Sequence, residues 1–132
     1  MQIKSFLGGF DKNLSYLVWC PSTKLASLVD PSVEPLTIFE FIDNNDLILE
    51  KILITHTHHD HFKYLDDFFY KYPLLSLFCY HKPINDLRHE YIGLTDNQVI
   101  SVGRYLLTTI HTPGHFPDSI CLWSKEKEII FT

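Results

Sequence analysis

Four histidines lie within six residues of this chain, in the segment 55–61 (THTHHDH), and they constrain its fold more than any other feature. The segment follows the apolar run 52–54, which is typical of a strand covered on both faces, and it precedes an amphipathic helical pattern. It therefore lies at a strand-to-helix junction. Side chains two apart on an extended segment point to the same side, so His56 and His58 can converge on one cation.

The other polar residues of the segment extend this candidate metal site. Asp60 and His61 follow at the turn before the helix, from which they can reach a second position nearby. Neutral imidazole and carboxylate form a donor set that suits zinc, and also iron or manganese. A histidine-rich surface loop is the competing interpretation, but alternating ligands at a strand end favour a metal site. His59 alternates away from His56 and His58, so we expect it to face outward.

A second histidine pair flanks a Pro-Gly turn in the segment 111–115 (HTPGH). The turn ends the predicted strand 105–110 and redirects the following side chain. A catalytic zinc ion is typically held by three protein ligands with one position left open. Because the first motif supplies two close imidazoles, His115 is predicted to be the third ligand. We expect His111 to support the loop by hydrogen bonding or packing.

Length and composition predict one α/β domain over residues 1–132, since 45% of the chain is apolar and 20% is charged. Strand patterns occupy both ends, and strands alternate with helices in the middle, which favours helices packed on a mixed sheet. The predicted strands are 2–6, 14–20, 24–29, 52–54, 74–80, 99–102, 105–110, 119–123 and 129–132, with turn residues at 8–9 and 11–13. The predicted helices are 35–42, with Leu36, Phe39 and Ile42 on one face, and 65–72, with Leu65, Phe68, Phe69 and Tyr72 on one face.

Charge and hydropathy narrow the range of partners. Eleven basic and sixteen acidic side chains give a net charge of −5 without a basic block, so we expect no nucleic acid partner. No apolar run is long enough to span a membrane and no signal peptide is visible, so we expect no membrane partner. Three widely spaced cysteines indicate buried thiols in a reducing cytoplasm rather than disulfides. A small molecule is the expected substrate.

The two histidine motifs, in this order, resemble the metallo-β-lactamase superfamily. The motif at 112–115 (TPGH) is most similar to the glyoxalase II (hydroxyacylglutathione hydrolase) branch. Residues 28–31 resemble the first motif of the superfamily, a strand that ends in Asp, and residues 131–132 resemble the start of a Phe-Thr-Gly-Asp element. The resemblance covers essentially the whole chain. It implies a four-layered αββα sandwich, of which this length supplies roughly the first half, a mixed sheet with helices on one face.

The resemblance also implies roles for individual side chains. It implies that one metal ion is held by His56, His58 and His115. It implies that a second ion is held by Asp60 and His61, and that Asp60 also orients the nucleophile.

Beneath these ligands, the resemblance implies that Asp30 orients the ligand loops, whereas the residues alone indicate only a turn that ends a strand. Two positions depart from the branch, because Phe116 and Asp118 stand where Thr and Gly are common. The segment 62–65 also lacks the glycines of many relatives. These departures bear on the substrate rather than on the metal.

The chain stops at Thr132, where the family pattern continues with Gly-Asp. The bridging Asp and the last metal-binding His of the family are therefore not in this sequence. We expect a truncated chain, a shortened gene product, or pairing with another chain, such as a second copy, that replaces the missing half. We also expect the inner face of the sheet to lack its partner sheet, which would expose a large apolar surface.

Three functions compete on these grounds. The first is a metal-dependent hydrolase, with one or two zinc ions, that cleaves thioesters such as S-acylglutathione. The second is a mononuclear iron enzyme of the sulfur dioxygenase type, which shares the motif at 112–115. The third is a catalytically incomplete metal-binding fragment. A flavodiiron protein is disfavoured because Glu is common there at the position of His58, and a nuclease is disfavoured by the acidic balance.

Overall fold

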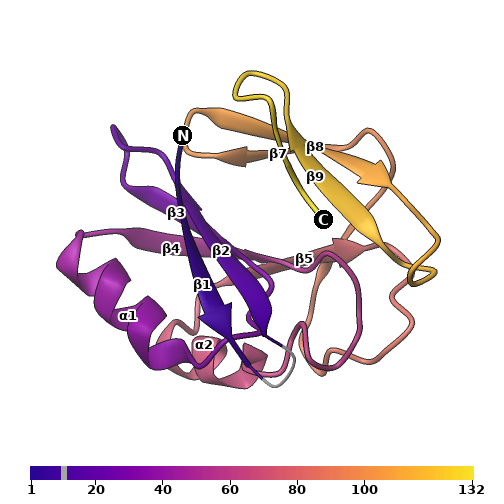
Figure 1. The fold of residues 1–132 in the computed structure, drawn as a ribbon, viewed down its shortest axis with the longest axis horizontal. Helices are drawn as coiled ribbons and strands as arrows, with labels where there is room; N and C mark the ends of the chain where they lie inside the picture. The colour runs from indigo at the N-terminus through magenta and orange to yellow at the C-terminus, as the bar shows by residue number, and fades with distance from the viewer. Residues whose placement is uncertain (10–11) are drawn as a thin grey trace.

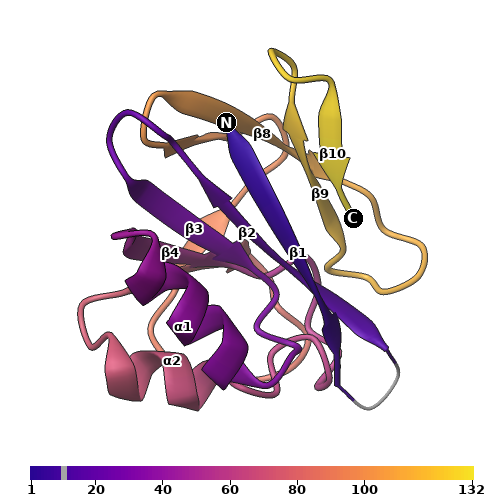
Figure 2. The same cartoon turned by 60° about the vertical axis from the view of Figure 1, so that its left-hand side comes forward.

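Two β-sheets face each other in this protein, and both helices cover the outer side of the first sheet (Figure 1, Figure 2). The computed structural model describes residues 1–9 and 12–132. The predicted turn residue Asp11 lies outside the described residues. Within the described residues, no helix is long and apolar enough to cross a membrane.

The first sheet is mixed and has six strands in the order β1-β2-β3-β4-β5-β6. Its strands are β1 (Gln2–Gly8), β2 (Asn13–Trp19), β3 (Leu25–Val29), β4 (Ile48–Leu53), β5 (Ser76–Tyr80) and β6 (Ile92–Leu94). The first three strands pair in antiparallel fashion, and β3 to β6 run parallel. The parallel run aligns the carboxyl ends of β3 and β4 at one edge, which is where ligands bind in open α/β sheets.

The two helices are the crossover connections of the parallel strands. Helix α1 (Pro35–Asn44) joins β3 to β4 and begins with a proline, which is preorganised for the first turn of a helix. Its buried residues are Ile38 and Ile42. The expectation that Leu36 shares the buried face is wrong, because this side chain is 65% exposed. The apolar arc is centred on Ile38 and Ile42, and Leu36 falls outside it.

Helix α2 (Leu65–Lys71) joins β4 to β5 and confirms the amphipathic pattern of its sequence. It buries Leu65 and Phe68 completely, and Phe69 and Tyr72 pack partly buried against the same core. The expected strand 74–80 begins only at Ser76, since Leu74 is 95% exposed. The short strand β6 was not predicted, because three residues that include a glycine give almost no periodic signal.

The second sheet is antiparallel, in the order β10-β9-β8-β7. Its strands are β7 (Val99–Val102), β8 (Tyr105–His111), β9 (Ile120–Ser124) and β10 (Ile129–Phe131). Alternate residues of these strands pack against the inner face of the first sheet, around Leu53 and Leu107. The expectation that the inner face lacks a partner sheet is therefore wrong. The last quarter of the chain folds back as this second sheet and buries the inner face of the first.

The uncovered apolar surface lies instead on the outer face of the second sheet. Leu106, Trp123 and Ile130 project from it and are 58%, 36% and 52% exposed. No helix of the described residues packs on this face, whereas α1 and α2 cover the corresponding face of the first sheet (Figure 2). The described chain thus forms three layers in the order helix, sheet, sheet.

Candidate metal centre

The candidate site lies at the edge where the two sheets meet. Asp30 directly follows β3, and residues 54–61 directly follow β4. His115 arrives from the other sheet, in the loop between β8 and β9. A backbone hydrogen bond of 2.8 Å from the Ile120 amide to the Thr55 carbonyl joins the two regions. The fold thereby brings together two motifs that lie far apart in the sequence.

Three imidazole rings converge at this edge, as the spacing of the motifs predicts. One ring nitrogen each of His56, His58 and His115 lie within 4.8 Å of one another. The Nδ1 atom of His58 is 3.1 Å from Nε2 of His56 and 3.2 Å from Nε2 of His115. Tetrahedral zinc with Zn–N bonds of about 2.0–2.1 Å separates its nitrogen ligands by about 3.3 Å. The rings are therefore spaced to share one cation, and their role as ligands stays a prediction.

A chain of hydrogen bonds fixes the tautomer of His56. The Thr55 amide donates to Oδ1 of Asp30 at 2.8 Å, and the Thr55 hydroxyl donates to Oδ2 at 2.6 Å. Because the proton of the hydroxyl points to the carboxylate, its oxygen must accept from Nδ1–H of His56, 3.0 Å away. The lone pair of His56 is then on Nε2, the nitrogen that faces the cluster. Such a partner is typical of histidines that bind metals.

Asp30 contacts a second histidine of the motif as well. Its Oδ2 lies 2.9 Å from Nδ1 of His61, and its side chain is buried. Burial by itself lowers the pKa of His61, but the hydrogen bond and charge of Asp30, with the charge of Asp60, outweigh burial and raise it. Burial, together with repulsion from His61, lowers the pKa of His56 to about 4. His56 is therefore neutral at pH 7, the form that binds metals.

Asp60 and His61 lie beside the imidazole cluster but outside it. Among the described residues, the group close enough to share an ion contains neither of them. Oδ2 of Asp60 instead accepts a hydrogen bond of 2.7 Å from Nδ2 of Asn13. Burial by itself would raise the pKa of Asp60, but the hydrogen bonds from Asn13 and from its own backbone help to hold it below its usual value. The second metal position stays a prediction.

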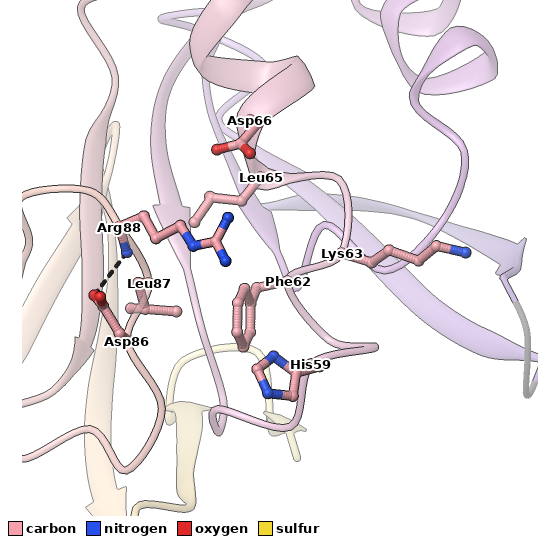
Figure 3. A pocket seen from close by; sticks show the side chains of 8 residues that line it. All are labelled: His59, Phe62, Lys63, Leu65, Asp66, Asp86, Leu87 and Arg88. Atoms are coloured by element: carbon pink, nitrogen blue, oxygen red, sulfur yellow. Dashed lines mark hydrogen bonds between the residues drawn. The ribbon is translucent and has the colours of Figure 1, made fainter.

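His59 faces outward, as its alternation predicts. Its ring is exposed and lies against Phe62, with 5.4 Å between ring centroids. Figure 3 shows both side chains in a separate cavity that Leu65, Leu87 and Arg88 also line. The cavity beside the cluster is a different one, of about 320 Å³, and its lining includes His56, His61, His115, Cys121 and Thr132.

Asp118, which the sequence motifs do not mark as a site residue, joins the two loops that carry the candidate ligands. It is 1% exposed and accepts hydrogen bonds from the amide and the hydroxyl of Thr57, which lies between His56 and His58. The Ile84 amide donates to the same carboxylate at 2.8 Å. Asp118 lies three residues after His115, so it links both ligand stretches. Its only signal was a departure, since a carboxyl group stands where the branch commonly has Gly.

Two aromatic side chains, His111 and Phe116, pack beside the loop that carries His115. His111 stacks on Tyr80, with ring centroids 4.2 Å apart, and its Nε2 lies 3.2 Å from the Pro117 carbonyl oxygen. This contact confirms that His111 holds the loop by packing and hydrogen bonding. Phe116 packs against the ring of His58, with 4.1 Å between centroids.

Comparison with known proteins bears out the resemblance. The family model of the metallo-beta-lactamase superfamily matches residues 8–132. A hydroxyacylglutathione hydrolase of Francisella tularensis subsp. novicida is 34% identical over 99% of this chain and 50% of its own length. A probable hydroxyacylglutathione hydrolase of Schizosaccharomyces pombe is 31% identical over 94% of this chain and 49% of its own length. The chain thus spans about half the length of these curated relatives.

Solved structures show the same fold. The B3 metallo-beta-lactamase BLEG-1 superimposes with a TM-score of 0.85 at 19% identity, over 98% of this chain and 70% of the other. ETHE1 from Myxococcus xanthus superimposes with a TM-score of 0.80 at 22% identity, over 94% of this chain and 54% of the other. With its paired sheets, its strand-end histidines and these relatives, the chain belongs to the metallo-β-lactamase superfamily.

Proposed function

We propose that this chain carries the metal-binding part of a zinc-dependent hydrolase that cleaves small thioesters such as S-acylglutathione. The observation that carries the proposal is the convergence of His56 Nε2, His58 Nδ1 and His115 Nε2 at 3.1 and 3.2 Å. The hydroxyacylglutathione hydrolases that resemble the chain support the substrate class. Three free cysteines support a reducing cytoplasm as its compartment.

The donor set fits a metal ion, because three imidazole nitrogens converge and the tautomer of one of them, His56, is fixed by Thr55. A zinc ion in such a site lowers the pKa of water to about 7 and supplies a nucleophile near neutral pH. Asp60, ionised beside the cluster, would orient that nucleophile and hold a second ion together with His61. The cavity lined by His56, His115 and Cys121 would receive the thioester.

A mononuclear iron enzyme of the sulfur dioxygenase type is the second candidate. One observation favours it: Asp60 and His61 are bonded to Asn13 and Asp30, while the three-histidine group stands alone among the described residues. A single ion in that group would suit an iron centre that binds oxygen. The third candidate, a metal-binding fragment without catalysis, is supported by the half-length match to the relatives.

The metal content of the purified chain tests the proposal. After dialysis, elemental analysis should find one zinc ion per chain. His56→Ala and His115→Ala should each lose the ion. The matched control, His59→Ala, should keep it, because His59 is exposed and lies in the other cavity. A wild-type chain without metal, or variants that keep their metal, would contradict the proposed centre.

The reaction separates the three candidates. The chain is reconstituted with zinc or with iron and assayed on S-acylglutathione and on a persulfide. Thioester cleavage with zinc supports the hydrolase, and oxygen uptake on the persulfide with iron supports the dioxygenase. Metal binding without either reaction supports the catalytically incomplete fragment. We expect the isolated chain to be a weak hydrolase at most, because it spans half of its relatives.

A further inference from the structure

Asn13 reaches Asp60 from a distant part of the chain. It is the first residue of β2 and pairs with Gly8 across the β1–β2 hairpin. Its side-chain amide donates a hydrogen bond of 2.7 Å to Oδ2 of Asp60, which lies 47 residues later in the sequence. Among the described residues, Asn13 is the only side chain that donates a hydrogen bond to Asp60. The edge hairpin of the first sheet is therefore fastened to the loop that carries the histidine motif.

The chemistry of this contact leaves half of the carboxylate free. A carboxylate offers two oxygens as acceptors, and the amide of Asn13 occupies Oδ2 only. Because an amide is neutral, it fixes the orientation of Asp60 without cancelling its negative charge, as Lys or Arg would. Oδ1 then has no side-chain donor among the described residues and can face a cation with its negative charge uncancelled.

His61 is held in the same way. Its Nδ1 lies 2.9 Å from Oδ2 of Asp30, so its Nε2 remains available. Asp60 and His61 each have one polar atom bonded to a neighbouring side chain, and no other described side chain bonds the second polar atom. The two supports come from the starts and ends of different strands, since Asn13 begins β2 and Asp30 follows β3. Both side chains are thus held before any ion arrives.

We propose that Asn13 is a positioning residue that presents Oδ1 of Asp60 to the second metal position of the proposed hydrolase. The inference rests on the proposed function, because it assumes that the histidine cluster holds the first ion. Loss of the amide frees Asp60 to rotate and weakens the second position selectively. Partners of this kind typically change metal affinity by about 10- to 100-fold.

Titration of the metal-free full chain with Co²⁺ tests the inference, because the absorption spectrum and calorimetry separate two binding events. The wild type should bind one ion tightly and a second more weakly. Asn13→Leu, similar in size but without a donor, should weaken the second event tenfold or more and leave the first within twofold. Asn13→Gln keeps a donor and should lie closer to the wild type. Asn44→Leu, an exposed asparagine on α1, is the matched control and should change neither event.

A double-mutant cycle distinguishes the loss of the Asn13–Asp60 contact from an indirect effect of the substitution on folding. Asp60→Ala should abolish the second event, and adding Asn13→Leu to it should change nothing more, because the two residues act through one contact. Equal weakening of both events by Asn13→Leu, no change in the second, or no second event in the wild type would overturn the inference and leave the proposed function intact. No binding of the first ion would overturn both.

Discussion

A single buried carboxylate organises two of the histidines in the candidate centre. Asp30 accepts two hydrogen bonds from Thr55 and lies 2.9 Å from His61. Through the Thr55 hydroxyl it decides which nitrogen of His56 keeps its lone pair. The Thr55 side chain, which is not itself a candidate metal ligand, therefore sets the tautomer of His56.

We expect Thr55→Val to weaken metal binding by about 10- to 100-fold, because valine keeps the shape and removes the link between Asp30 and His56. Competition with a chelator measures this affinity. Thr109→Val is the matched control, since the Thr109 hydroxyl is buried without a hydrogen-bond partner. Metal affinity that survives Thr55→Val unchanged would show that the hydroxyl does not set the tautomer.

The stability of the metal-free chain should fall as the pH falls from about 6.5 to about 4. Burial first, and then repulsion from His61, lowers the pKa of His56 from 6.5 to about 4 in the folded state. In this window the unfolded chain binds a proton that the folded chain does not, so protonation favours unfolding by up to about 3 kcal/mol. Urea denaturation at several pH values measures the effect.

His56→Gln isolates this contribution from that of His61. The raised pKa of His61 has the opposite sign, because its stabilisation is complete below pH 6.5 and is lost as the pH rises through its folded value. The variant keeps His61 but lacks the His56 titration, so it should lose less stability on acidification. Parallel pH curves for the variant and the wild type would rule out the assigned pKa.

At the scale of elements, short loops at the ends of strands carry the site, and buried carboxylates hold them. Asp118 is the clearest case, since it joins the loop after β4 to the loop between β8 and β9 and to residue 84. The aligned ends of β3 and β4 supply the platform. The amphipathic helices contribute indirectly, by burying the outer face of the sheet that positions these ends.

Replacing Asp118 by Ala should cost about 3 kcal/mol of unfolding free energy, because the buried amide and hydroxyl of Thr57 and the partly buried amide of Ile84 lose their acceptor. Urea denaturation of the metal-free chain measures the loss. Asp96→Ala removes a more exposed carboxylate that accepts from the His111 amide, and it should cost less than about 1 kcal/mol. Equal effects of the two substitutions would argue against the linking role of Asp118.

At the scale of the whole molecule, one apolar face has no cover within the described residues. Leu106, Trp123 and Ile130 share the outer side of the second sheet, and the register places Ile130 directly opposite Trp123. Contiguous exposed apolar groups of this kind mark surfaces of association. The other outer face of the molecule is covered by α1 and α2.

We expect the chain to self-associate through this face as its concentration rises, which sedimentation equilibrium detects as a rising average mass. Ile130→Lys should reduce the association by placing a charge in the middle of the face. Leu74→Lys makes the same change of charge at a 95% exposed site between α2 and β5 and should behave like the wild type. A mass that stays monomeric for the wild type at all concentrations would contradict the expectation.

The sequence by itself determined the identity and order of the histidines, because alternation at a strand end and a Pro-Gly turn are local features. The same holds for α2, because its periodicity defines one buried face. Helix α1 has apolar residues on several sides, so its sequence did not define the buried face and Leu36 was wrongly assigned to it. Local patterns also located the strands of the second sheet. They could not show that this sheet covers the inner face of the first.

Only the tertiary structure decided which atoms meet. The choice of Nδ1 in His58, the hold of Asn13 on Asp60 and the buried position of Asp118 all depend on contacts between residues 47 to 61 apart in the chain. No period of two or 3.6 residues reports such contacts, because they arise from the packing of two sheets against each other. The sequence therefore indicated the candidate ligands, and the fold decided which of their atoms meet and which neighbours hold them.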